Sequence, residues 1–286
     1  MDYLRVRALA LATLLFSPST SAQSWATTTT YTFSDPTLPT GLIASSDLIQ
    51  DTSSSPPAPH NHQFNPSNVQ ISQNFLHLIV PGNQTSSPII QSAEISTTTA
   101  NILHASVRTF AILTNESGIC NGMFFYHSDS QEIDIEWISD PLSPSNEDGT
   151  TRVMQYTNQG KHGTEDAMEV SGVAPQDATE EVHEYRVDWV DGSSRFFVDG
   201  EFQREIGGNV PTMGGQWVWN AWSNGDPEFT VGPPKNDAVF KIQQIVMMYN
   251  TTDDHDQQGS NSGSVRILPV LYGLGVTFLS IALIVL

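Results

Sequence analysis

Short stretches in which apolar and polar residues alternate make up most of the chain, and they predict β-strands. The clearest are FLHLIV at 75–80, ILHASVRTFAIL at 102–113, HEYRVDWV at 183–190, SRFFV at 194–198 and EFQREI at 201–206. A period of two puts successive side chains on opposite faces of a sheet, so each stretch predicts a strand with one buried face. No long stretch follows the 3.6-residue period of a helix.

Turn signals separate these stretches and indicate how the strands are joined. Asp191-Gly192 and Asp199-Gly200 each lie between two apolar runs, and Asp-Gly pairs favour the primed turns that match the twist of antiparallel strands. Many short strands in one chain predict an all-β fold, either a two-sheet sandwich or a jelly roll. We expect one such domain over residues 23–252.

The start of this domain shows weaker patterning. The segment from Ser24 to about Ser67 is rich in Ser, Thr and Pro, with SSSPPAPHNH in its middle. Such a composition is typical of loops. We therefore expect this segment to be an irregular leader and loop rather than a separate domain.

The stretch QEIDIEW at 131–137 alternates carboxylates with large apolar residues. The carboxylates are Glu132, Asp134 and Glu136, and the residues between them are Ile133, Ile135 and Trp137. On a strand the outer two carboxylates have Cα atoms ~13 Å apart, and side chains that lean together bring their carboxyls to ~5 to 6 Å. That separation suits a retaining glycosidase, in which one carboxylate is the nucleophile and the other acts first as acid and then as base.

The middle carboxylate, Asp134, also has a role in this glycosidase hypothesis. Three acids this close titrate as a coupled set, so at least one holds a proton near neutral pH. Asp134 would bond to the nucleophile and tune its partner. The spacing by itself is weak evidence, because a solvated strand face or a calcium site in an acidic chain would look the same.

A second stretch, QWVWNAW at 216–222, predicts a sugar-binding face beside core tryptophans. Alternation puts Gln216, Val218, Asn220 and Trp222 on one face, and Trp217, Trp219 and Ala221 on the other. Aromatic rings stack on the apolar faces of sugars and amides bond sugar hydroxyls, so we expect Asn220 and Trp222 to bind substrate. In MQYTNQG, Met154, Tyr156 and Asn158 share a face, which makes that face a further candidate.

Composition and charge narrow the possible partners. The chain has 286 residues, of which 38% are hydrophobic and 9% aromatic, enough for a large core. Eleven Lys and Arg against 31 Asp and Glu give a formal charge of −20, which argues against nucleic acid or an anionic membrane surface as a partner. The chemistry requires no cofactor or metal, although a structural calcium ion elsewhere is left open.

The chain contains one cysteine, Cys120, so an intramolecular disulfide is excluded. No Cys-His arrangement accompanies it. We expect it to be a small buried apolar side chain rather than a nucleophile.

The N-terminus predicts secretion. Arg5 and Arg7 precede an apolar run from Ala8 to Phe16, and small residues follow up to Ala22, the order of a signal peptide over residues 1–22. Three sequons, at Asn83, Asn115 and Asn250, predict N-glycosylation.

The C-terminus predicts attachment to a membrane. A polar stalk at 253–266, rich in small residues, precedes an uncharged tail at 267–286. This order is typical of a glycosylphosphatidylinositol anchor signal, with Ser260 or Asn261 as the attachment residue and the tail removed. A single membrane-spanning helix is the alternative, since 20 residues suffice to cross a bilayer. Both place the protein at the outer surface of a cell.

The QEIDIEW stretch resembles the active-site strand of family 16 glycoside hydrolases, in the version found in lichenases and in fungal and plant cell-wall transglycosylases. The similarity continues through SAEI at 92–95, NGMFFY at 121–126, QYTN at 155–158, HEYRVDW at 183–189, FFVDG at 196–200 and WNAW at 219–222. The resemblance implies a concanavalin A-like β-jelly-roll sandwich of two antiparallel sheets with a concave sugar cleft.

The resemblance also implies roles for particular residues. Glu132 would be the nucleophile, Asp134 the assisting acid and Glu136 the general acid/base. The residues that match cleft positions are Tyr156, Asn158, Asn220 and Trp222. The expected function is a monomeric retaining endo-β-glycosidase that hydrolyses or transfers β-1,3 or β-1,4 bonds of a β-glucan in the cell wall.

Two other functional classes are left open. One is a non-catalytic carbohydrate-binding jelly roll at the cell surface, which the presence of both glutamates disfavours. The other is a calcium-dependent adhesive domain. Three carboxylates on one flat strand supply only part of the six or more oxygens that calcium needs.

Overall fold

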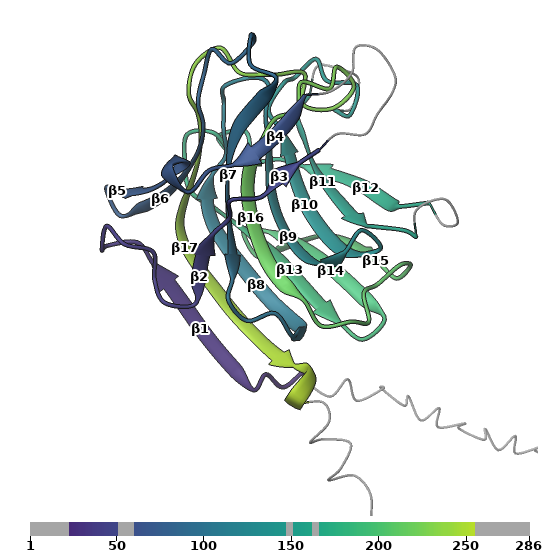
Figure 1. Cartoon of the computed structure of the whole chain (residues 1–286). Helices are drawn as coiled ribbons and strands as arrows, with labels where there is room; N and C mark the ends of the chain where they lie inside the picture. Colours follow the sequence, from purple (N-terminus) through teal and green to yellow (C-terminus); the bar gives the residue numbers. More distant parts are fainter. Residues whose placement is uncertain (1–22, 51–59, 147–150, 162–165, 255–286) are drawn as a thin grey trace, which may run out of the picture.

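The computed structural model describes residues 23–50, 60–146, 151–161 and 166–254 (Figure 1). The signal peptide, the C-terminal tail and all but the start of the polar stalk lie outside these residues. Among the described residues, no helix is long and apolar enough to span a membrane.

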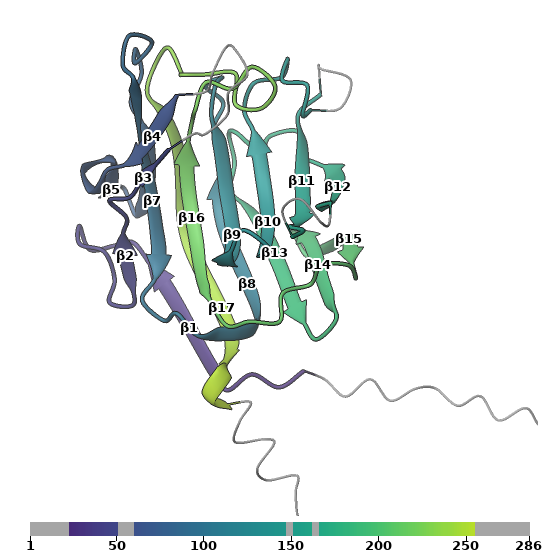
Figure 2. The same ribbon diagram turned by 45° about the vertical axis from the view of Figure 1, so that its right-hand side comes forward.

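Two β-sheets face each other (Figures 1 and 2). The eight-stranded sheet contains, in order, β15 (Glu201–Ile206), β14 (Ser193–Val198), β13 (His183–Val190), β8 (Ile102–Ile112), β17 (Ala238–Thr251), β6 (Phe75–Val80) and β5 (Val69–Ser72), with β1 (Thr27–Thr32) on β17. The nine-stranded sheet contains β12 (Met168–Val173), β11 (Val153–Asn158), β10 (Gln131–Ile138), β9 (Cys120–Ser128), β16 (Gln216–Trp222), β7 (Ile89–Thr97), β4 (Asn61–Phe64) and β3 (Leu48–Ile49), with β2 (Leu42–Ala44) on β7.

This architecture confirms the predicted all-β jelly-roll sandwich. In the part of the chain that the structure describes, all strand pairs are antiparallel except β4 and β7, which run parallel. A single 3₁₀ turn, η1 (Pro66–Asn68), joins β4 to β5. The Asp199-Gly200 turn between β14 and β15 has positive φ at both residues, 50° and 79°, which is the conformation that a type I′ turn requires.

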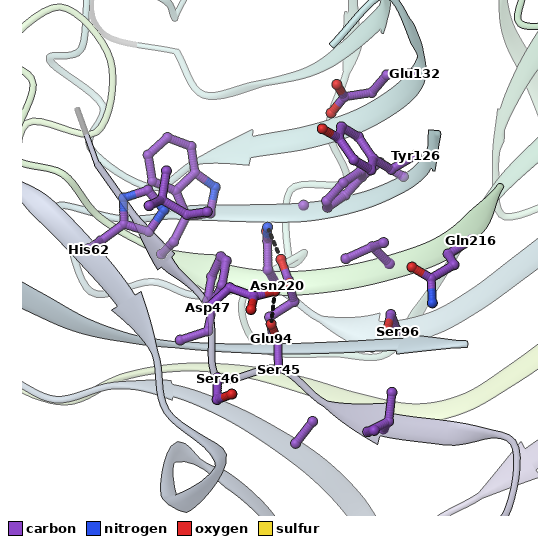
Figure 3. Close-up of a pocket in the computed structure, with 18 of the residues that line it drawn as sticks. Ser45, Ser46, Asp47, His62, Glu94, Ser96, Tyr126, Glu132, Gln216 and Asn220 are labelled. Carbon is purple, nitrogen blue, oxygen red and sulfur yellow. Dashed lines mark hydrogen bonds between the residues drawn. The ribbon is translucent and has the colours of Figure 1, made fainter. Parts of the chain in front are cut away.

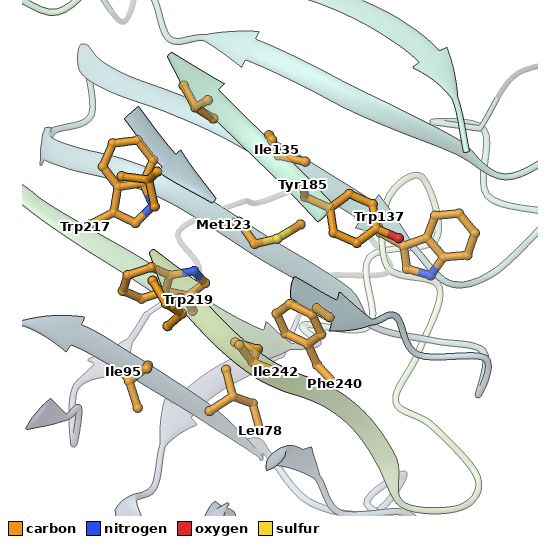
Figure 4. Packing of buried hydrophobic residues seen from close by; sticks show 14 of the residues in the cluster. Leu78, Ile95, Met123, Ile135, Trp137, Tyr185, Trp217, Trp219, Phe240 and Ile242 are labelled. Carbon is orange, nitrogen blue, oxygen red and sulfur yellow. The ribbon is translucent and has the colours of Figure 1, made fainter. Parts of the chain in front are cut away.

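The core fills the space between the sheets (Figure 4). Trp217 and Trp219 lie in it, as the alternation of QWVWNAW predicted, and the Trp219 indole donates a 2.8 Å hydrogen bond to Thr109 Oγ1. Trp137 from β10 is buried as well and donates to the carbonyl of Thr114 at 2.9 Å. Trp219 and Trp137 therefore contribute apolar burial with their N–H groups paired, whereas the buried Trp217 Nε1 has no hydrogen-bond partner among the described residues.

The N-terminal segment differs from the expectation of irregular structure, because it forms four strands. β1, with the sequence TTTTYT, pairs with β17 over six residues, and β4 pairs with β7. Threonine is β-branched and favours strands, and Tyr31 and Phe33 bury their rings in the core. A Thr-rich composition was therefore misread as a loop when it belongs to strands at the margin of the sandwich.

One predicted glycosylation site is also corrected. The Asn250 side chain is 3% exposed, its Oδ1 accepts a 2.8 Å hydrogen bond from Ala26 N, and its Nδ2 donates to the Ser24 carbonyl at 3.2 Å. A glycan on that nitrogen would displace the chain that leads into β1. Asn83 and Asn115 are exposed, and glycosylation there stays a prediction.

Candidate active site

Strand β10 carries the three carboxylates on one face and buried apolar residues on the other. The regular pairing with β9 runs from Glu132 to Ile138, after a register shift at Gln131. The apolar face consists of Ile133, Ile135 and Trp137, each at most 3% exposed. Because side chains alternate along a regular strand, this buried face holds the carboxylates on the opposite side.

The three carboxylates line a cleft of about 730 Å³ over the nine-stranded sheet, and Figure 3 shows Glu132 in it. β9 and β16 form its floor next to β10. The far wall is formed by β7, by residues between 43 and 49, and by His62 and Phe64 of β4. Gly122 on β9 lies directly beside Glu136. A Cβ at that glycine would be 2.5 Å from Asn220 Oδ1, so the missing side chain keeps the floor open.

Glu132 and Asp134 form a coupled pair. Burial raises the pKa of Glu132, and the hydrogen bond from Asp134 opposes that rise. Burial and the neighbouring Glu132 raise the pKa of Asp134 well above its usual value. Asp134, which is 3% exposed, therefore keeps its proton and donates it in a hydrogen bond to Glu132. Asp134 Oδ2 accepts a 2.9 Å hydrogen bond from Gln159 Nε2.

The pKa of Glu136 is higher than that of an ordinary glutamate. Burial and the neighbouring Asp134 raise its pKa to about 8, and a hydrogen bond from Cys120 opposes the rise. The Cys120 thiol donates to Glu136 Oε1 at 3.4 Å. A carboxyl with this pKa still carries its proton at neutral pH, which is the state that a general acid needs.

A fourth carboxyl, Glu94 on β7, lies across the floor from Glu136. The row runs from Glu136 through Gly122 and Asn220 to Glu94. Burial raises the Glu94 pKa to about 7, against hydrogen bonds from Asn220 and Ser45. Asn220 Nδ2 donates to Glu94 Oε2 at 3.3 Å (Figure 3). The cleft is therefore acidic on both sides.

Asn220 and Trp222 line the cleft with the carboxylates, on the face that alternation predicted. The Asn220 Oδ1 is buried and has no hydrogen-bond partner among the described residues. Trp222 is less available, because the His62 ring stacks on it at 4.9 Å between centroids and Phe229 stacks at 5.8 Å. His62 therefore occupies a ring face that a sugar would otherwise use.

Tyr156 and Asn158 are not in the cleft, which corrects their expected placement. Tyr156 pairs with Ile135 and faces the core, where its ring stacks on Phe196 at 4.7 Å. Asn158 is fully buried and its Nδ2 donates to the Gly208 carbonyl at 2.9 Å. The face of β11 that matches the carboxylates carries Gln155 beside Glu136 and Thr157 beside Asp134.

Four residues near the carboxylates were missed as functional candidates. They are Glu94, Cys120, Tyr126 and Gln159. Burial raises the pKa of Tyr126 to about 12, and its hydroxyl donates to Asp129 Oδ1 at 2.9 Å. Tyr126 pairs with Glu132, and Glu94 pairs with Asn220. Both lie in stretches that carry the family resemblance, SAEI and NGMFFY, but strand register is what places them beside the site. Within the described ranges, no group of three or more His, Cys, Asp or Glu side chains could hold a metal ion.

A family profile and a yeast protein match the sequence of this chain. The profile of Glycosyl hydrolases family 16 matches residues 58–232. Congo red hypersensitive protein 1 of Saccharomyces cerevisiae is 25% identical over 177 residues, which cover 57% of this chain and 33% of the yeast protein. The chain thus matches about a third of the length of that relative.

Solved structures share the fold. The laminarinase catalytic domain of Thermotoga maritima MSB8 superposes with a TM-score of 0.62 at 15% identity, over 80% of this chain and all of that domain. A prokaryotic β-1,3-1,4-glucanase (lichenase) from a mouse hindgut metagenome gives 0.60 at 17% identity, over 79% of this chain and 99% of the lichenase. Because the family profile covers more than half of the sequence, this chain belongs to glycosyl hydrolase family 16.

Proposed function

We propose that the protein is a retaining endo-β-glycosidase that cleaves or transfers β-1,3 or β-1,4 bonds of a β-glucan. The observation that carries the proposal is the row of three carboxyls on one face of β10, in a cleft that raises the pKa of each. The structural relatives include a β-1,3-1,4-glucanase and an endo-1,3-β-glucanase, which supports this substrate class.

The first step uses two carboxyls in opposite protonation states. Glu136 gives its proton to the glycosidic oxygen, and the Glu132 carboxylate attacks the anomeric carbon as the bond to that oxygen breaks. The products are a covalent glycosyl ester on Glu132 and a free sugar hydroxyl. Asp134 supports this step by its hydrogen bond to Glu132.

The second step decides between hydrolysis and transfer. Glu136, now ionised, takes a proton from the attacking group, which then displaces Glu132 from the anomeric carbon. Water gives a shortened glucan with retained configuration, whereas the hydroxyl of another glucan gives a longer chain. The Asn220 side chain lines the cleft, and its amide is suited to bind a sugar hydroxyl next to the reacting centre.

The test is incubation of the secreted domain with β-1,3, β-1,4 and mixed-linkage glucans and with chitin oligomers. Mass analysis of the products identifies cleavage and transfer, and proton NMR follows the anomer that forms first. The first product should be the β-anomer. Binding without any product would overturn the enzymatic proposal in favour of a carbohydrate-binding module, and an α-anomer would overturn the retaining mechanism.

We further propose that the protein acts as a monomer at the outer cell surface, held by a glycosylphosphatidylinositol anchor. The support is in the sequence, namely the signal peptide at 1–22 and the apolar tail at 267–286. Phosphatidylinositol-specific phospholipase should release the protein from membranes. Recovery of peptides from beyond residue 266 in the mature protein would instead indicate a spanning helix.

A further inference from the structure

We propose that Cys120 is a positioning residue, whose buried thiol holds one carboxyl oxygen of Glu136. The inference rests on the role that the proposed function gives to Glu136, and it extends that role by assigning a task to the single cysteine of the chain. Cys120 contacts neither water nor the open cleft, since its exposed fraction is 0%. It therefore acts through Glu136 rather than on a substrate.

The strand register explains how the two side chains meet. Glu136 on β10 pairs with Gly122 on β9, and Cys120 lies two residues along β9 on the same face. Such diagonal neighbours are within reach of a long side chain. Because Gly122 has no side chain, the Glu136 carboxyl can lean toward Cys120, and Oε1 accepts the thiol proton at 3.4 Å. Oε2 is then the oxygen left for the glycosidic bond.

The acidic groups around Glu136 disfavour its charged form, and the hydrogen bond from Cys120 opposes them. Asp134 on β10 and Glu169 on β12 both disfavour the Glu136 carboxylate, and Glu132 on β10 interacts with it as well. The neighbour on β11 is Gln155, which is uncharged and donates to the Ser145 carbonyl at 2.9 Å. Cys120 is the residue that favours the charged form of Glu136.

The direction of proton donation follows from burial. Burial and Glu136 raise the pKa of the Cys120 thiol well above its usual value, so the sulfur keeps its proton and donates it. A hydrogen bond to the carboxylate assists Glu136 when it must become ionised and act as the base. It also restricts the carboxyl to one orientation through both steps.

Two substitutions isolate this hydrogen bond. Cys120→Ala and Cys120→Ser leave nearly the same space and differ by one hydroxyl, which can donate to Glu136 in place of the thiol. The first readout is the pKa of Glu136, measured by carbon NMR on protein labelled at the glutamate carboxyl and assigned with Glu136→Gln. The second is the pH dependence of kcat/KM on the glucan that the natural protein uses.

The Glu136 pKa should be higher in Cys120→Ala than in Cys120→Ser by about half a unit to one unit. The basic limb of the pH profile should move upward by the same amount. kcat/KM should be about threefold to tenfold lower in the alanine variant, through kcat rather than KM.

Equal Glu136 pKa values in the two variants would overturn the proposal, whatever their stability. If the natural protein turned over no glycan, the proposed function would fail. The NMR titration would still decide whether Cys120 bonds Glu136.

Discussion

Strands β16 and β11 lie in the same sheet and both carry amides and aromatic residues, yet only β16 contributes the residues that its sequence suggested. In β16, Asn220 and Trp222 face the cleft. In β11, Tyr156 and Asn158 face the core. The difference lies in the contrast between the two faces of each strand.

In β16 the two faces differ in the sequence itself. One carries Trp217 and Trp219, which are too large and apolar to be left in water, so the other face must be the cleft. In β11 all six residues are buried, and each face carries one amide and one hydroxyl, Gln155 with Thr157 on one face and Asn158 with Tyr156 on the other. Alternation separates the residues of a strand into two faces. When both faces are buried, it does not tell which face lies on the side of the carboxylates.

The largest effect should come from β10, whose faces contrast most sharply. Glu132→Gln and Glu136→Gln should each lower kcat by about 10²- to 10⁴-fold while the fold is kept, because Gln preserves shape and removes only the charge or the proton. Steady-state kinetics and circular dichroism measure the two outcomes. Glu201→Gln, at an exposed position of β15, is the control, and wild-type rates in either active-site variant would contradict the assigned roles.

The comparison between β11 and β16 can be tested directly. Tyr156→Ala should lower the free energy of unfolding by about 3 to 5 kcal/mol, because it empties a core site. Tyr156→Phe should keep full activity and stability, since the hydroxyl is buried without a partner. Asn220→Ala should lower kcat/KM about tenfold or more. Loss of activity in Tyr156→Phe would indicate that the Tyr156 hydroxyl contacts the substrate, and it would contradict the contrast drawn between β11 and β16.

The acidic cleft should also set how stability depends on pH. Burial raises the Glu94 pKa from 4.5 to about 7, so between these values the folded state binds more protons than the unfolded state. Stability must then fall as pH rises through this window. Denaturant titrations at a series of pH values should show that the free energy of unfolding declines with pH in the natural protein. The decline should be shallower in Glu94→Gln, by on the order of 2 kcal/mol. If the free energy of unfolding had the same dependence on pH in both proteins, the raised pKa of Glu94 would be contradicted.

The smallest effect is expected at Ile135, on the core face of β10. Ile135→Val keeps the parity of the strand and should cost about 0.5 to 1.5 kcal/mol of stability with no change in kcat. Thermal unfolding and a single rate measurement suffice. A large loss of activity would mean that the carboxylates depend on the packing of this side chain and not only on strand parity.

Much of the fold could be predicted because its strands are amphipathic. FLHLIV matches β6 residue for residue, and HEYRVDWV matches β13. β1 was missed because threonine occupies positions on both of its faces, which hides the alternation, and because its partner β17 lies more than 200 residues further along the chain. The same long-range contact buries Asn250, which made its sequon misleading.

The sequence by itself determined the faces of β10 and β16, because large apolar residues at every second position have to be buried and parity along a strand then places the rest. Only the tertiary structure decided which face of β11 lies on the side of the carboxylates, that Glu94 lies opposite Glu136, and that Cys120 reaches the Glu136 carboxyl. These depend on register between strands far apart in the chain and on burial in the assembled cleft. Burial also raises the carboxyl pKa values, and no local stretch of sequence contains that environment.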